Sequence, residues 1–160
     1  MDKRKNIIRP AFCLGLLFLL LLAAGCSQSP TEAPVSTVIS GYDSLGVSKY
    51  DYLDTYYFKS GATNYGSFQL MWLAAGTPSI VQFISNYGIK MGTGTVAPDS
   101  GYFHDSTLEN SPLGQSFFIK TDNVPHFGKI TITSRRDHAD TTFIGFQWVV
   151  QTVAGKRELY

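Results

Sequence analysis

The stretch QSFFIKTDNVPHFGKITITSRRDHADTTFIGFQWVVQTV, residues 115–153, decides the fold class of this chain. Three runs of aromatic and β-branched residues are separated in it by two short polar segments, which is the pattern of strands joined by turns. We predict strands over 115–121, 127–134 and 141–153, with a turn at 122–125 and a polar connection at 135–140. Because such short connections join antiparallel neighbours, the stretch predicts a three-stranded meander.

Alternation within the last two runs indicates which side chains face the core. Ile130 and Ile132 alternate with lysine and threonine, so we expect the isoleucines to point inward. In the longest run, four large apolar residues occupy every second position and share one face, namely Ile144, Phe146, Trp148 and Val150. The sequence therefore predicts a sheet with one buried and one solvated side.

The preceding part of the chain has the same character and shows no helical period. We predict strands over 53–59, 65–74, 79–85 and 87–91, and a glycine-rich loop over 92–101. Phe68, Leu70 and Trp72 share the inward face of their strand, and Met71 lies on the other face. We conclude that residues 41–160 form a single antiparallel all-β domain, meander-like or sandwich-like.

The N-terminus has the features of an export signal. Four basic residues precede the uncharged, leucine-rich run 11–24, which ends in Ala23-Ala24-Gly25-Cys26. With Leu22 before them, these residues resemble the lipobox of bacterial lipoprotein precursors. The resemblance implies that residues 1–25 are a cleaved lipoprotein signal peptide and that Cys26 carries lipid, palmitate included. An uncleaved signal anchor, the alternative, would require about 20 apolar residues.

The residues after Cys26 predict a tether rather than a folded element. Ser, Thr and Pro are frequent in 26–40, and Glu32 is the single charge.

Two or three acyl chains on one cysteine hold a protein on a membrane almost permanently. We therefore expect the protein to be anchored in the cell envelope through its N-terminal lipid. Ser27, in place of the aspartate that retains lipoproteins in the inner membrane, favours the outer membrane, on its periplasmic or its surface face.

Charge and cysteine content exclude several classes of partner and fold. Of 13 Lys and Arg residues four lie in 1–25, and of 12 Asp and Glu residues one lies there, which leaves nine basic against eleven acidic residues. A net charge of −2 without a basic run predicts no nucleic-acid partner. Cys13 leaves with the signal and Cys26 is acylated, so a hydrophobic core must hold the domain together without a disulfide.

The predicted meander resembles the end of the HmuY-type haem-binding lipoproteins. The resemblance is carried by three segments, Phe117 to Asp122, Phe127 to Ile132 and Thr142 to Trp148. Weaker similarity extends upstream to the segment Tyr56 to Gly61, to Trp72 and to the glycine-rich loop after Ile89.

Membership of that family implies a lipid-anchored β domain that captures haem and delivers it to an outer-membrane transporter. Two departures limit what can be carried over. Leu73 follows Trp72 where the family usually has aspartate, and the segment between the glycine-rich loop and the meander is too short to hold the family's ligand-bearing central part. The resemblance therefore assigns no haem ligand by position.

His104 is the best candidate for a haem ligand on chemical grounds. Tyr102 and Phe103 precede it and could stack on a flat apolar ligand, and Asp105 could orient its imidazole. Met71 and Met91 could serve as thioether ligands, although methionine near a strand is more often core filler. A histidine beside an aspartate is more often a solvated loop residue, and that explanation of His104 stands beside the ligand one. His126 and His138 are expected to be solvated turn residues.

No pattern in the sequence indicates catalysis, and we expect no enzyme. Neither a Gly-x-Ser-x-Gly elbow nor a His-Glu-x-x-His or Cys-x-x-Cys metal motif occurs. The main alternative to haem capture is a structural or adhesive β domain that contacts envelope proteins or glycans through exposed tyrosines. A ligand carrier requires a concave apolar site, whereas an interaction domain requires an aromatic surface.

Overall fold

In the computed structural model, residues 36–76, 78–108 and 113–160 are described. The predicted signal peptide, Cys26 and most of the predicted tether lie outside these residues. The described part forms one compact unit from Ser36 to Tyr160 and contains strands but no helix. Within it, no helix is present that could span a membrane. Its eight strands are β1 (Val38–Ser48), β2 (Leu53–Ser60), β3 (Thr63–Ala74), β4 (Ile80–Met91), β5 (Phe103–Leu108), β6 (Ser116–Lys120), β7 (Phe127–His138) and β8 (Thr141–Gln151).

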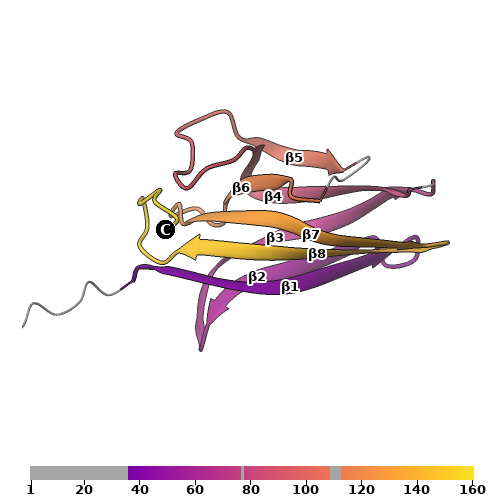
Figure 1. Cartoon of the computed structure of the whole chain (residues 1–160), viewed down its shortest axis with the longest axis horizontal. Coiled ribbons are helices and arrows are strands. Elements are labelled where there is room, and N and C mark those ends of the chain that lie inside the picture. Colours follow the sequence, from indigo (N-terminus) through magenta and orange to yellow (C-terminus); the bar gives the residue numbers. More distant parts are fainter. Residues whose placement is uncertain (1–35, 77, 109–112) are drawn as a thin grey trace, which may run out of the picture. The chain divides into compact units, whose positions relative to one another are not determined.

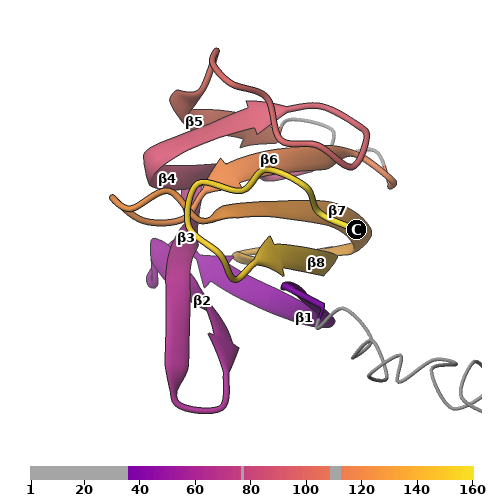
Figure 2. The ribbon, with the colours of Figure 1, turned by 90° about the vertical axis from the view of Figure 1, so that its left-hand side faces the viewer.

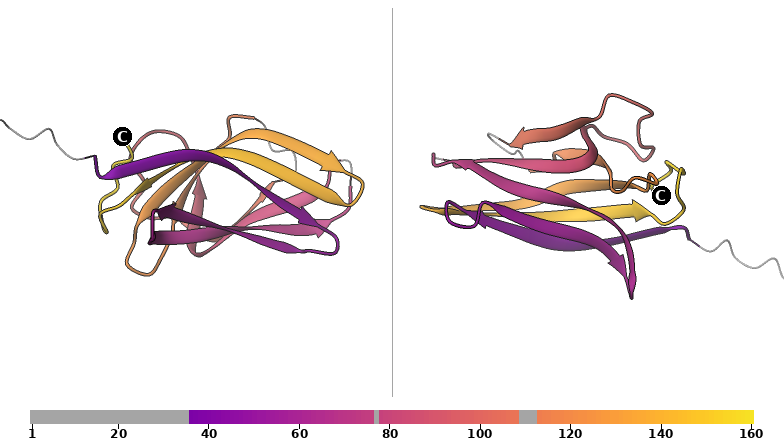
Figure 3. Two further views of the ribbon diagram at one scale, coloured as in Figure 1. Left: turned by 90° about the horizontal axis from the view of Figure 1, so that it is seen from below. Right: turned by 180° about the vertical axis from the view of Figure 1, so that it is seen from behind.

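All eight strands belong to one antiparallel sheet. Seven of them follow the order β1-β8-β7-β6-β4-β3-β2, and β5 pairs with β4 beside this path (Figure 1). The predicted meander is confirmed, because β6, β7 and β8 are neighbours in both the sequence and the sheet. β1 continues it by pairing with β8 over its whole length (Figure 3).

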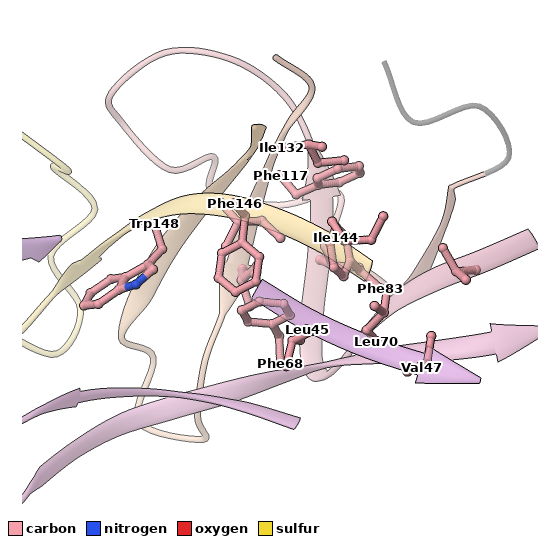
Figure 4. Packing of buried hydrophobic residues seen from close by; sticks show 14 of the residues in the cluster. Leu45, Val47, Phe68, Leu70, Phe83, Phe117, Ile132, Ile144, Phe146 and Trp148 are labelled. Atoms are coloured by element: carbon pink, nitrogen blue, oxygen red, sulfur yellow. The ribbon is translucent and has the colours of Figure 1, made fainter. Parts of the chain in front are cut away.

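The sheet folds over so that its inward faces pack on one another. β2 and β3 leave the remaining strands as a hairpin that projects beyond β1 (Figure 2). The residues predicted to face inward are buried, and the ring of Phe68 meets those of Phe83 and Phe146 edge-on at the centre (Figure 4). At about 25 cal/mol per Å² of buried apolar surface, this aromatic core supplies the main stabilisation of a domain without disulfides.

A second, smaller apolar cluster covers the outer face of the meander. It consists of Ala97, Phe118, Phe127 and Leu159, with Tyr102 packed against it. The 92–102 loop and the C-terminal residues are held there by an isolated bridge between Val96 and Glu158. One region of the predicted solvated side is therefore covered by the chain's own loop and tail.

Four predicted boundaries differ from the structure. β1 begins at Val38, so the last residues of the predicted tether are already paired. The two strands predicted over 79–91 form one strand, β4. Gly88 within it has a positive φ (+121°), and the sequence around it predicts a break between two strands. β7 continues to His138 through the predicted polar connection. Its second half pairs with β8 but not with β6, so its side chains can be polar on both faces of the strand. β5, which contains His104, is not among the predicted strands.

Candidate functional site

Tyr102 is a packing residue of the small outer cluster. Its ring lies 6.4 Å from that of Phe127, and the Lys120 ammonium sits 4.7 Å from its centroid. Its hydroxyl donates to the Pro98 carbonyl at 3.2 Å. Burial raises the pKa of Tyr102 to about 12, with the Arg157 charge opposing that shift and Asp99 adding to it. The phenol therefore stays protonated and holds the 92–102 loop on the sheet.

Phe103 and His104 begin β5 and are both exposed. Phe103 pairs with Ile89 and Asp105 with Ile84, so His104 lies opposite the irregular segment 85–88 of β4. The Nδ1 atom of His104 is 4.0 Å from the Asp105 carboxylate, which is too long for a hydrogen bond. The predicted orienting contact is therefore not formed.

The two methionines lie apart from each other and from β5. Met71 is on the outer face of β3, between Leu53 of β2 and Gln82 of β4. Met91 ends β4, is exposed, and accepts a 3.3 Å contact from the Gln115 amide. The structure does not bring these sulfur atoms and the His104 imidazole around one space.

Three hollows stand out on the described surface, with volumes of about 30, 120 and 190 Å³. Ligand pockets commonly measure about 300–1,000 Å³. None of the five candidate residues Met71, Met91, Tyr102, Phe103 and His104 lines any of the three. Among the described residues, no group of three His, Cys, Asp or Glu side chains is placed to hold a metal ion.

His126 differs from its prediction as a solvated turn residue. Its side chain is mostly covered, and Nδ1 lies 2.5 Å from the Asp122 carboxylate, whose other oxygen accepts the His126 backbone N–H at 2.8 Å. The ring of Tyr65 meets the imidazole edge-on at 5.6 Å. The turn 122–126 is thus an ordered structural element. His138 is exposed as expected, but it ends β7 instead of lying in a turn.

Four exposed tyrosines lie on β1, β2 and the turn between them. Tyr42, Tyr50, Tyr52 and Tyr57 are 74%, 77%, 61% and 48% exposed. We call these four residues the β1–β2 aromatic surface. Lys49 and Lys59 lie 4.9 and 5.0 Å from the centroids of the Tyr50 and Tyr57 rings. Tyrosines that are exposed in the free protein and already oriented are typical anchors of protein interfaces.

A carboxylate holds the two end strands of the sheet together. Asp54 of β2 accepts the Gly46 N–H of β1 at 3.3 Å through one oxygen and the Thr55 N–H at 2.8 Å through the other. β1 and β2 therefore meet through a side chain instead of a backbone ladder. Next to this junction Tyr56 packs inward, and burial together with the Asp43 charge raises the pKa of Tyr56 to about 12.

The indole of Trp148 lies at the same junction with an unsatisfied donor. Trp148 is 8% exposed and packs against Tyr56 and Phe58 of β2. Its Nε1 atom is buried and has no hydrogen-bond partner in the described part of the chain. A Cβ on Gly41 of β1 would lie about 3 Å from Nε1, so the polar edge of the ring extends over β1.

Comparison with known proteins identifies no relative: no family model, no curated protein and no solved structure matches this chain.

The β1–β2 aromatic surface was not among the residues singled out from the sequence. One signal for it is present, because five of the nine tyrosines fall between positions 42 and 57. That signal does not say which tyrosines are exposed. Tyr56 and Tyr57 are adjacent in the chain, yet the first packs into the core and the second faces solvent, as alternation along a strand requires.

Proposed function

We propose that this protein is a noncatalytic, lipid-anchored binding protein of the bacterial envelope, and that it engages another protein through the β1–β2 aromatic surface. The exposure of four tyrosines on the consecutive strands β1 and β2 and their connecting turn carries this proposal. Tyrosine buries a large area at low entropic cost and supplies a hydroxyl, which is why it is enriched at binding sites. Anchoring depends on the lipid predicted at Cys26.

Because the interior of the domain is filled with side chains, binding at the protein surface is favoured and binding in an internal cavity is disfavoured. Ten large side chains of the interior are less than 2% exposed, five of them phenylalanines. A haem pocket would have to open on the outside of the sheet, where His104 and Met91 are exposed and lie apart from Met71. Haem capture for an outer-membrane transporter remains a prediction of the family resemblance, and a direct titration can test it.

Site-specific crosslinking in cells tests the proposed function. A photoreactive phenylalanine analogue replaces Tyr50 or Tyr52 in the full-length protein, and Tyr160, which is equally exposed but lies at the C-terminus, serves as the matched position. We expect one discrete crosslinked protein from positions 50 and 52 and none from 160.

Rebinding of the purified pair completes the test. The crosslinked protein is identified, purified and titrated against the wild type and the Tyr52→Ser and Tyr160→Ser variants. We expect Tyr52→Ser to weaken binding at least tenfold and Tyr160→Ser to leave it unchanged, because a buried anchor tyrosine contributes about 2 kcal/mol or more. Equal crosslinking from all three positions, or equal affinity of the two variants, would contradict the proposal.

A further inference from the structure

The backbone groups of β1 divide between its two edges in a regular way. Thr152 N–H donates to the Thr37 carbonyl at 2.7 Å, and Lys49 N–H donates to the Asp140 carbonyl at 3.1 Å, both in register with the β1–β8 pairing. Antiparallel strands alternate hydrogen-bonded and non-hydrogen-bonded pairs. Odd-numbered residues of β1 therefore bond to β8, and even-numbered residues direct their N–H and C=O groups to the opposite edge.

Most N–H groups on that opposite edge have a partner inside the domain. The bonds run from Ser48 N–H to the Asp51 carbonyl (3.0 Å), from Gly46 N–H to Asp54 (3.3 Å), from Ser44 N–H to Asp43 (2.8 Å) and from Val38 N–H to Ser36 Oγ (3.3 Å). Of the N–H groups on this edge, those of Ser40 and Tyr42 remain. No described residue accepts a hydrogen bond from either N–H group, and we call the backbone from Ser40 to Tyr42 the β1 window.

The unsatisfied indole N–H of Trp148 lies against the middle residue of the β1 window, Gly41. Gly41 is the centre of the β1 window, and its missing side chain makes room for the Nε1 edge of the ring. A buried donor without an acceptor costs about 1–3 kcal/mol. Two free backbone N–H groups on the strand edge and one buried indole N–H group without an acceptor thus belong to the same short stretch of β1.

We propose that the β1 window takes up an extended strand of a partner polypeptide, which adds to the sheet beside β1. This inference rests on the proposed function and names the site of contact. An added strand would accept from the Ser40 and Tyr42 N–H groups and donate to their carbonyls, the pattern of strand addition at an exposed edge. A threonine or asparagine opposite Gly41 would bring an acceptor to the side of the strand on which Nε1 lies.

Charge identifies the partner strand as basic and disfavours a second copy of this chain. Residues 36–48 contain Asp43 and no Lys or Arg, and Asp51 and Asp54 follow in the adjoining turn and β2. Lys49, the next cation along the chain, is paired with Asp140 at 2.8 Å. Two copies joined at this edge would bring like charges together, whereas a lysine or arginine beside Asp43 would be attracted.

A peptide of alternating valine and threonine with a lysine at each end is the probe for this site. Backbone amide exchange of the protein is followed by NMR with and without the peptide at millimolar concentration. We expect exchange of the Ser40 and Tyr42 amides to slow at least tenfold and the Trp148 indole resonance to shift. Protection of other amides instead, or no protection, would overturn the proposal.

Three controls separate strand addition from nonspecific association. Ser40→Pro removes one free-edge donor and leaves the β8 ladder intact, since proline is tolerated where the N–H faces outward; it should abolish protection at Tyr42. The same peptide N-methylated at alternate residues should not bind.

A peptide with glutamates in place of the lysines should bind the wild type at least fivefold more weakly, and Asp43→Lys should reverse that preference. Equal binding of both peptides to both proteins would refute the charge selection.

The crosslinked partner distinguishes failure of this inference from failure of the proposed function. If Ser40→Pro leaves partner affinity unchanged while Tyr52→Ser lowers it, strand addition is refuted and the aromatic surface stands. If neither substitution changes the affinity, the proposed function itself is refuted.

Discussion

The carbonyl oxygen of Thr121 occupies the space in which any side chain at Gly66 would have to lie. Gly66 has φ +98°, and a Cβ there would overlap the Thr121 carbonyl group. Ser67 N–H donates to that carbonyl at 3.0 Å, and the Thr121 hydroxyl donates back to the Tyr65 carbonyl. This contact joins the start of β3 to the end of β6, two strands that pair with different halves of β4.

Gly66→Ala should therefore lower the free energy of unfolding by roughly 2–4 kcal/mol, from backbone strain and overlap together. Gly61→Ala is the matched control, because Gly61 also has positive φ (+57°) but meets nothing within 4 Å. We expect that control to lose about 1 kcal/mol. Urea unfolding followed by tryptophan fluorescence measures both, and equal losses would show that the Thr121 contact is not tight.

Gly41→Ala and Gly46→Ala test how β1 fits against β8. Each new methyl group would lie under 3 Å from a ring, that of Trp148 at Gly41 and that of Phe143 at Gly46. Trp148 is buried among aromatic side chains, whereas Phe143 is 42% exposed and free to turn away. We expect Gly41→Ala to cost about 1–3 kcal/mol and Gly46→Ala under about 0.5 kcal/mol in urea unfolding. The reverse order would contradict the packing described for Trp148.

Asp137 should make the domain more sensitive to acid. Burial alone would raise the pKa of Asp137, but hydrogen bonds from Arg135 (2.8 and 3.0 Å) and Thr142 (2.8 Å) outweigh it and lower that pKa below 3.8. The ionised carboxylate therefore stabilises the fold fully at neutral pH, and this stabilisation is lost as the pH falls below the ordinary aspartate range.

Asp137→Asn should accordingly cost about 1–2 kcal/mol at pH 7 and progressively less toward pH 2, measured by urea unfolding across that range. Asp51→Asn is the control, because the Asp51 carboxylate accepts no hydrogen bond in the described part of the chain. A deficit of Asp137→Asn that stays constant with pH would argue against a role for ionisation.

Lipidation at Cys26 predicts the location of the protein in a cell. Cys26→Ser should abolish incorporation of labelled palmitate, leave the signal uncleaved by the lipoprotein peptidase, and lose the firm membrane attachment of the wild type. Cys13→Ser, within the predicted signal, should change none of these. Labelling that persists in Cys26→Ser would refute the assigned anchor.

Haem titration tests the ligand that the family resemblance implies. Because His104 is exposed and 4.0 Å from Asp105, we expect no narrow, saturable Soret band at micromolar haem. A saturable band that His104→Ala abolishes would establish haem capture through His104. A band unaffected by that substitution would direct attention to Met71, Met91 and the remaining histidines.

Local sequence was sufficient to predict the fold class and most of the core. Alternation in β7 and β8 places Ile130, Ile132, Ile144 and Phe146 on one face in any sheet that buries them, because a strand has a period of two residues. The predicted meander followed from the same pattern and from short connections. Predicted and observed boundaries differ where a strand is polar on both faces, as in the second half of β7.

Only the tertiary structure decided where the candidate sites lie. Tyr102 and Phe103 are adjacent in the sequence, but the small outer cluster partly buries the first, whereas the second is exposed to solvent. The free edge of β1 likewise depends on the pairing of residues more than a hundred positions apart. A sequence pattern records which residues can be buried, whereas the long-range register determines which backbone groups and side chains are left without a partner.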